Sequence, residues 1–203
     1  MGSDVHRNVT QLLLDQGVYS EDKLLDVLRA CIEAHPAEAK RVKLKMKNDS
    51  ERDNKLLATV VEAINTQLEP LGLKVAKMKF RKTPYYGLVN LVEDDLAKAA
   101  QPLGKAEQEY FHRLVGEILG APGSKLDHTQ AESLGKELST KMPLQEVRAC
   151  LLRLENAHWL LQTDEGEYLL GVRSELQRRY LKDEAGEGEG AGGSGPGVVE
   201  MDE

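Results

Sequence analysis

The sequence has few aromatic residues and almost no cysteine, and each scarcity excludes a class of protein. Aromatic residues make up 4% of the chain while hydrophobic residues make up 40%, so we expect a helix-rich protein with a core mainly of Leu, Val and Ile. The two cysteines, Cys31 and Cys150, are too few for a disulfide framework or a cysteine-based zinc site. Both stand among apolar residues, which predicts two buried thiols in a reducing compartment.

Several other features are missing. No hydrophobic run approaches the roughly 20 residues needed to span a membrane, and no signal peptide opens the sequence, so we expect a cytosolic or nuclear protein without a membrane role. No two of the five histidines are spaced i, i+4, and no nucleophile elbow, Walker loop or Rossmann glycine fingerprint occurs. The sequence therefore predicts no catalytic residue, no metal ligand and no small-molecule substrate in this chain.

The acidic charge is concentrated at the end of the sequence. The net charge is −7, but every charged residue from Asp183 onward is acidic, and residues 1–182 are neutral overall. The segment 182–203 is also rich in glycine, so we predict a flexible acidic linker or tail.

Apolar periodicity predicts three helices followed by a β-hairpin in residues 4–92. The expected helices span about 4–16, 21–35 and 51–69, and the expected strands span 73–80 and 85–92. Residues 37–50 are strongly charged and weakly patterned, so we interpret them as a loop. Three helices followed by a hairpin is the order of a winged helix.

The same order recurs in residues 105–181, although the residues themselves do not match. Helices are expected at about 105–119, 127–138 and 143–154, strands at 159–163 and 167–170, and a last helix at 174–181. A linking helix is expected within residues 93–104. The predicted fold is therefore α+β and mostly α, with two tandem winged-helix domains at 4–92 and 105–181, each of three helices plus a β-hairpin.

Two segments of the first repeat carry basic residues without acidic ones, at 40–47 and at 74–82. In a winged helix both places lie near the face that commonly meets a duplex, where such clusters neutralise phosphates without reading bases. The candidate DNA-binding residues are Lys43, Lys45, Lys74, Lys77, Lys79, Arg81 and Lys82. The alternative is a solvated loop followed by an edge strand that its lysines protect from aggregation.

The third helix of this repeat carries several acidic residues, so any binding should be weak, salt-sensitive and indifferent to sequence. Replacing Lys77, Lys79, Arg81 and Lys82 by Glu is expected to weaken duplex binding without lowering the melting temperature.

The second repeat has more apolar side chains than one small domain is expected to bury in its core. Adjacent leucines in its third helix and wing point to different faces, so one of each pair is a candidate for partner contact. The candidate partner-binding residues are Leu151, Leu154, Trp159 and Leu160, with core packing as the alternative for each. Trp159 is the expected anchor, because buried aromatic side chains dominate interface energies.

Several of these segments, taken in order, resemble a known family. They are Asp4–Arg7, Gln11–Leu13, Gly17–Val18, Tyr86–Leu91, Trp159–Leu160, Gly166–Tyr168 and Arg173–Tyr180. Together they resemble the non-SMC element one subunit of the SMC five/six complex, over nearly all of residues 4–181. The departures from the family are the charged insertion at 37–50 and the Gly/Glu-rich tail.

The resemblance implies a stable complex with a MAGE-type winged-helix partner and, through it, a kleisin subunit. It also implies a nuclear role in chromosome maintenance and recombinational DNA repair. Family members continue into a RING-like zinc domain associated with ubiquitin-ligase activity, and no ligand for that domain occurs here, so zinc and ligase activity are expected only in a domain absent from this chain. The competing interpretation is a stand-alone winged-helix transcription regulator, which would need basic and amide side chains along a third helix.

Overall fold

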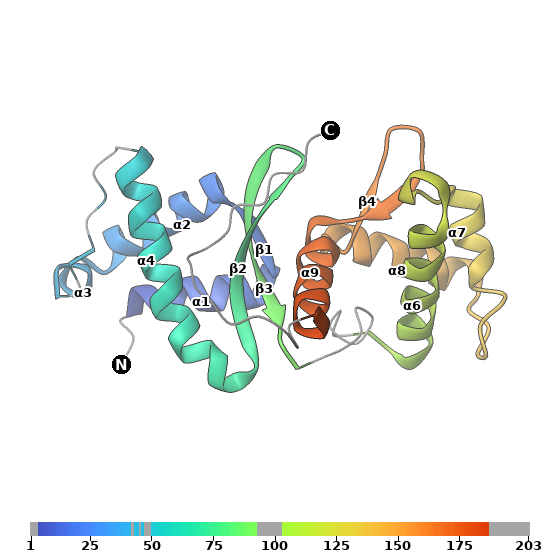
Figure 1. Ribbon diagram of the computed structural model, residues 1–203, viewed down its shortest axis with the longest axis horizontal. Coiled ribbons are helices and arrows are strands. Elements are labelled where there is room, and N and C mark those ends of the chain that lie inside the picture. The colour runs from blue at the N-terminus through green and yellow to red at the C-terminus, as the bar shows by residue number, and fades with distance from the viewer. Residues whose placement is uncertain (1–3, 42, 45, 47–49, 93–102, 187–203) are drawn as a thin grey trace. The chain divides into compact units, whose positions relative to one another are not determined.

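The computed structural model describes residues 4–41, 43–44, 46, 50–92 and 103–186 (Figure 1). These residues form two compact units that separate between Leu91 and Val92. Both units combine helices with a small antiparallel sheet, which confirms the predicted mostly helical α+β class. The expected linking helix at 94–100 lies outside the described residues, as does most of the predicted flexible tail at 182–203. The prediction is wrong for residues 182–186, which form the last turn of a helix that ends at Gly186.

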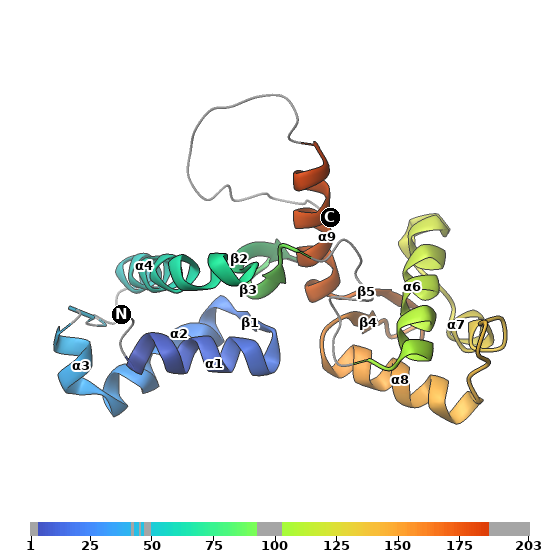
Figure 2. The same cartoon turned by 90° about the horizontal axis from the view of Figure 1, so that it is seen from below.

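The first unit packs amphipathic helices against a hairpin. Helices α1 (Asp4–Gln16) and α2 (Glu21–Ala34) contact each other, and α4 (Ser50–Leu68) contacts both (Figure 2). A short 3₁₀ turn, η1 (Glu69–Leu71), continues α4 towards the hairpin. The Ser20 hydroxyl caps α2 by accepting a hydrogen bond from the Lys23 amide, as its position at the start of the apolar stripe predicts. The core is built mainly from Val5, Val9, Leu13, Leu24, Leu28, Leu57, Ile64, Val75 and Tyr86.

The sheet of this unit has one strand more than the sequence predicts. Strands β2 (Leu73–Phe80) and β3 (Thr83–Asn90) form the expected hairpin, and β1 (Val18–Ser20) pairs with β3 to give the order β1-β3-β2. Because β1 has only three residues, it is too short to show an alternating pattern. Its position is set by pairing with β3, where Tyr19 lies opposite Tyr86.

The prediction of a loop at 37–50 is wrong in its first part. Residues Pro36–Arg41 form the helix α3, whose first residue is a proline that suits the start of a helix. Ala39 is buried within the first unit, and Leu44 beyond the helix is buried as well. One buried side chain in a six-residue helix gives no readable period, so only packing against the rest of the unit reveals this helix.

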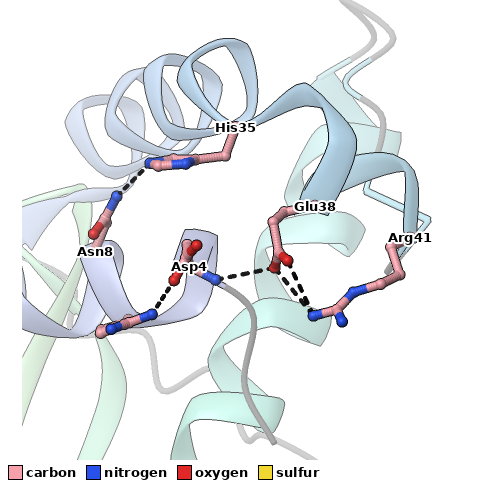
Figure 3. Close-up of polar contacts among 6 residues, drawn as sticks. Asp4, Asn8, His35, Glu38 and Arg41 are labelled. Atoms are coloured by element: carbon pink, nitrogen blue, oxygen red, sulfur yellow. Dashed lines mark hydrogen bonds and ion pairs between the residues drawn. The ribbon is translucent and has the colours of Figure 1, made fainter.

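Polar contacts hold α3 against the start of α1 (Figure 3). The Glu38 carboxylate accepts a hydrogen bond from the Asp4 amide at 3.3 Å and pairs with Arg41 at 3.1 Å. Just before α3, His35 Nε2 lies 2.9 Å from Asn8 Nδ2. The carboxylate thus satisfies an amide at the positive end of α1, and Arg41 is already engaged by a carboxylate of its own helix.

The second unit has its own helices, hairpin and core. The elements are α6 (Lys105–Gly120), η2 (Pro122–Ser124), α7 (His128–Leu134), α8 (Leu144–Asn156), β4 (Leu160–Gln162), β5 (Tyr168–Leu170) and α9 (Val172–Gly186). The largest fully buried side chains include Tyr110, Phe111, Leu114, Ile118, Leu151, Leu154 and Leu160. The Tyr110 hydroxyl donates a buried hydrogen bond to the Ala131 carbonyl at 3.0 Å, which joins α6 to α7.

Helix α7 ends at Leu134, four residues earlier than the predicted end at Leu138. At Gly135 the chain passes so close to α8 that a Cβ atom would lie 2.3 Å from Val147 Cγ2. The Gly135 carbonyl then accepts a hydrogen bond from the Met142 amide, which closes the segment between the two helices. Leu138 is buried all the same, so the prediction that it faces the core is confirmed, while the prediction that it is helical is wrong.

Candidate functional site

The tip of the β2–β3 hairpin presents two cations on a tight turn. Phe80 pairs with Thr83, so the loop consists of Arg81 and Lys82 alone, with φ angles of 46° and 70°. Two-residue hairpin loops with positive φ at both positions are normally Asn-Gly, because other side chains crowd the backbone there. Both cations are exposed, and the Arg81 guanidinium lies 5.9 Å from the Phe80 ring centroid. The tip therefore carries two charged residues in a backbone conformation that Asn-Gly would adopt at a lower energetic cost.

Lys77, a second candidate on this hairpin, is held by a buried carboxylate. Its ammonium pairs with Glu21, a residue only 8% exposed, and lies 5.3 Å from the Tyr86 ring centroid. Burial acts to lower the pKa of Lys77, but the hydrogen bond and charge of Glu21 and the neighbouring Tyr86 together raise it. Lys77 therefore neutralises a buried charge that would be costly alone. Its replacement by Glu would place two carboxylates together, which does not fit the expectation of an unchanged melting temperature.

The remaining DNA-binding candidates occupy different surroundings. Lys79 lies on the same face of β2 as Lys77 and Lys74 on the opposite one, since side chains alternate along a strand. Both are half-buried, and both already take part in interactions within the chain. Lys43 is exposed just beyond α3 with φ of 59°, and Lys45 lies outside the described residues. The structure thus brings the hairpin candidates onto one element. Arg81 and Lys82 at its tip are exposed, whereas Lys77 is exposed but paired with Glu21.

The four partner-binding candidates are core residues of the second unit. Leu151, Leu154, Trp159 and Leu160 are all 3% exposed or less. The large apolar side chains that α8 does expose are Leu144 and Leu152, at 44% and 58%.

Leu144, Arg148 and Leu152 follow one another at intervals of four along α8, on one exposed face of the helix. This face lies beside the buried stripe of Val147, Leu151 and Leu154. The sequence predicts that one member of each leucine pair faces outward, and at Leu151–Leu152 the outward member is Leu152 rather than the candidate Leu151. The i, i+8 spacing of the exposed leucines was the signal that could have identified them.

Leu152 borders a shallow depression of about 160 Å³, lined by His128, Arg148, Leu151, Leu152, Glu155, Gln162 and Tyr168. His128 stacks on Tyr168 with ring centroids 5.7 Å apart, and its Nε2 lies 3.0 Å from the Glu132 carboxylate. The same carboxylate binds Arg148 Nε at 2.5 Å, and this hydrogen bond is the main reason that the pKa of Glu132 is lowered. The depression is thus lined by both apolar and polar side chains, a mixture that is typical of a protein–protein contact surface.

The described residues contain no cluster of metal-ligating side chains and no exposed cysteine. No group of three or more His, Cys, Asp or Glu among them could hold a metal ion. Both cysteines are free and buried, as expected, and burial raises the pKa of Cys150 to about 12, so its thiol stays protonated and unreactive. Within the same residues, no helix is long and apolar enough to cross a membrane.

Comparison with known proteins identifies the class to which this chain belongs. A family model described as "Nse1 non-SMC component of SMC5-6 complex" matches residues 6–177. The match covers most of the sequence. The chain belongs to the Nse1 family, which confirms the resemblance described above.

Individual relatives agree with this assignment. The chain is 28% identical to the non-structural maintenance of chromosomes element 1 homolog of Xenopus tropicalis, covering 88% of this chain and 62% of that protein. It is 25% identical to the homolog of Homo sapiens, covering 89% of this chain and 64% of that protein. The chain therefore spans less than two thirds of the length of these relatives. A chain from a solved "Nse1-Nse3-Nse4 complex" matches 91% of this chain and 76% of its own length, with a TM-score of 0.72 and 25% identity.

Proposed function

We propose that this chain is the docking subunit of an SMC5-6-type complex, binding an Nse3-type partner of the MAGE family and, through it, an Nse4-type kleisin. The observation that carries the proposal is the likeness, over 91% of this chain, to a chain solved in the Nse1-Nse3-Nse4 complex. We further propose that both units are winged-helix domains. In support, each unit places three helices of seven or more residues before an antiparallel hairpin, α1-α2-α4-β2-β3 in the first and α6-α7-α8-β4-β5 in the second. The first unit adds the short elements α3 and β1 to this order.

The second unit supplies the proposed docking surface. This surface comprises Leu144, Arg148 and Leu152 on α8 together with the depression beside Leu152. Exposed large apolar side chains on one face of a helix, next to a polar rim, are typical of a contact surface. The buried candidates Leu151, Leu154, Trp159 and Leu160 support this surface from below as core residues.

Co-expression tests the docking proposal. The full chain, co-expressed with the Nse3- and Nse4-type subunits of the same organism, is expected to purify with them as one complex. Leu152→Ser should weaken the complex by about tenfold or more, because it removes an apolar contact at the centre of the surface. Leu119→Ser is the matched control, since Leu119 is a comparably exposed leucine on α6 of the same unit. Equal binding by both variants would remove α8 from the interface, and failure of the unmodified chain to co-purify would overturn the docking proposal.

We also propose that the first unit assists non-specific binding of duplex DNA, with the hairpin tip in the main role. Arg81 and Lys82 are exposed cations in the two-residue loop of the hairpin. Contacts of such cations with DNA phosphates depend on salt and are independent of base sequence. Lys43, Lys45, Lys74 and Lys79 are proposed as further contacts. Lys77 contributes by holding the hairpin against α2 through Glu21.

The geometry does not favour the alternative of a sequence-specific transcription regulator. Such a protein needs available basic side chains on a third helix. On α4, Lys55 pairs with Glu51 at 2.7 Å. On α8, Arg148 and Arg153 pair with the carboxylates of Glu132 and Glu107. These cations are therefore engaged within the chain rather than presented to bases.

The activity of the whole protein is a wider proposal. Zinc binding and ubiquitin-ligase activity belong, by the family resemblance, to a RING-like domain whose ligands the described residues do not supply. A nuclear location and a role in DNA repair follow from the proposed assembly. For the residues present here we propose binding functions only.

A further inference from the structure

Arg173 is a half-buried cation for which the described residues provide no carboxylate. Its guanidinium carbon lies 4.5 Å from the centroid of the Trp159 ring. Its Nε atom is shielded from solvent and has no hydrogen-bond partner. Burial lowers the pKa of Arg173 to about 10, and no neighbouring charge among the described residues opposes that effect. The side chain thus carries the cost of burial without the ion pair that normally offsets it.

The backbone, and not an ion pair, fixes Arg173 over the indole ring. The Arg173 amide donates to the His158 carbonyl at 3.0 Å and the Gly171 amide to the Trp159 carbonyl at 2.9 Å. The Ser174 hydroxyl donates to the same Trp159 carbonyl at 2.6 Å. At Gly171 a Cβ atom would lie 2.3 Å from the His158 carbonyl oxygen, so the close approach of the two segments requires glycine. Arg173 is therefore held in place before any partner arrives.

Four other arginines of the same unit are neutralised by carboxylates. The pairs are Arg113 with Glu137, Arg148 with Glu132, Arg153 with Glu107, and Arg178 with Glu175. Arg173 differs from these four in having an aromatic ring on one face and no acid beside it. A guanidinium stacked on an aromatic ring keeps its edge available for a bidentate carboxylate.

We propose that Arg173, stacked on Trp159, binds a carboxylate from an acidic side chain of the docking partner. This inference rests on the proposed function, because it adds a second contact to the docking subunit. A protein carboxylate is favoured over a nucleic-acid phosphate because the surrounding unit is not basic. The acids that neutralise its other arginines would repel the closely spaced phosphates of a duplex.

The chain has a single tryptophan, so a fluorinated tryptophan label places one fluorine NMR probe at Trp159. The full labelled chain is titrated with the unlabelled Nse3- and Nse4-type subunits. We expect the signal to shift on binding. Arg173→Gln should weaken the complex by about tenfold or more, since the partner's carboxylate loses its cation. Arg173→Lys should retain part of the affinity, because it keeps the charge but lacks the planar fork.

Arg179→Gln is the matched control, as Arg179 is a half-buried arginine on the same helix, and we expect its affinity to change by less than about twofold. The melting temperature of free Arg173→Gln should be unchanged or higher, because the mutation removes an uncompensated charge. A lower melting temperature with unchanged affinity would show a purely structural role and overturn the inference.

Three further outcomes also count against the inference. Equal affinity of Arg173→Gln and the unmodified chain would overturn it while leaving the proposed function intact. No binding by the unmodified chain would overturn both. The chain's own acidic cluster, Glu93, Asp94 and Asp95, and duplex DNA are the other occupants to test at the Arg173 site. A shift of the fluorine signal in the free chain, either when these acids are replaced by amides or when duplex DNA is added, would overturn the inference.

Discussion

Replacing the hairpin tip by Asn-Gly should make the first unit more stable and bind DNA less well. Arg81 and Lys82 both adopt positive φ, which costs roughly 1 kcal/mol per residue for side chains of this kind. Asn tolerates this backbone and Gly is free to adopt it, although Gly gives back about 0.5–1 kcal/mol through the entropy of the unfolded chain. The net gain of Arg81→Asn/Lys82→Gly is therefore about 1 kcal/mol, which raises the melting temperature of a domain of this size by about 4–8 °C.

The same change removes two charges from the proposed DNA contact. Each phosphate contact contributes roughly 0.9 to the slope of log affinity against log salt concentration. If both cations neutralise phosphates, their loss should therefore make this slope shallower by about 1.8. Differential scanning calorimetry of the full chain measures the first effect. Fluorescence anisotropy with a labelled duplex, repeated over a salt series, measures the second.

The matched control is Arg81→Gln/Lys82→Gln, which removes the same charges but leaves two long side chains in the left-handed conformation. This control should bind DNA as weakly as the Asn-Gly variant does, but its melting temperature should not rise. Equal melting temperatures of the two double variants would show that the turn is not strained. Unchanged DNA binding in both would remove the hairpin tip from any DNA interface.

Three other changes test separate contacts. Lys77→Met should lower the free energy of unfolding by about 2 kcal/mol in urea denaturation, because it leaves a buried carboxylate unpaired. This figure is reduced to allow for the 35% exposure of the lysine side chain, and an unchanged free energy of unfolding would mean that the pair is not stabilising. Gly171→Ala should lower the melting temperature of the second unit strongly, because its Cβ would meet the His158 carbonyl oxygen. Gly116→Ala on α6, where there is open space, should raise the melting temperature slightly. Similar changes in melting temperature for both variants would contradict the close approach at Gly171. Cys150, with a pKa raised to about 12, should react with a thiol reagent only on unfolding, and rapid labelling of the folded chain at this position would contradict its burial.

The elements that the sequence predicted are those with a local pattern long enough to read. Helices α1, α2, α4, α6 and α8 each carry an apolar stripe, and β2 was predicted with its observed bounds because the period changes from helical to alternating after Gly72. The missed elements, β1 and α3, are a three-residue strand and a six-residue helix. Their conformation depends on pairing with β3 and packing against α1, which are contacts that no local pattern reveals.

The candidate site was predictable only in part, for the same reason. The basic hairpin was evident from composition, but the role of Lys77 depends on Glu21, which is 56 residues away in the sequence. The excess apolar surface of the second repeat was also recognised. Its outward member on α8 is Leu152 rather than Leu151, because the two neighbours lie 100° apart on a helix of about 3.6 residues per turn and only the packed structure fixes which one faces the core.

The mass of the assembled complex tests whether this chain is a docking subunit. The purified full chain is mixed with the Nse3- and Nse4-type subunits of its own organism and measured by size-exclusion chromatography with light scattering. We predict a single species with the summed mass of one copy of each subunit, and its loss when residues 103–186 are deleted, because that deletion removes the proposed surface on α8. Separate elution of the intact chain from the other two subunits would contradict its assignment as a docking subunit.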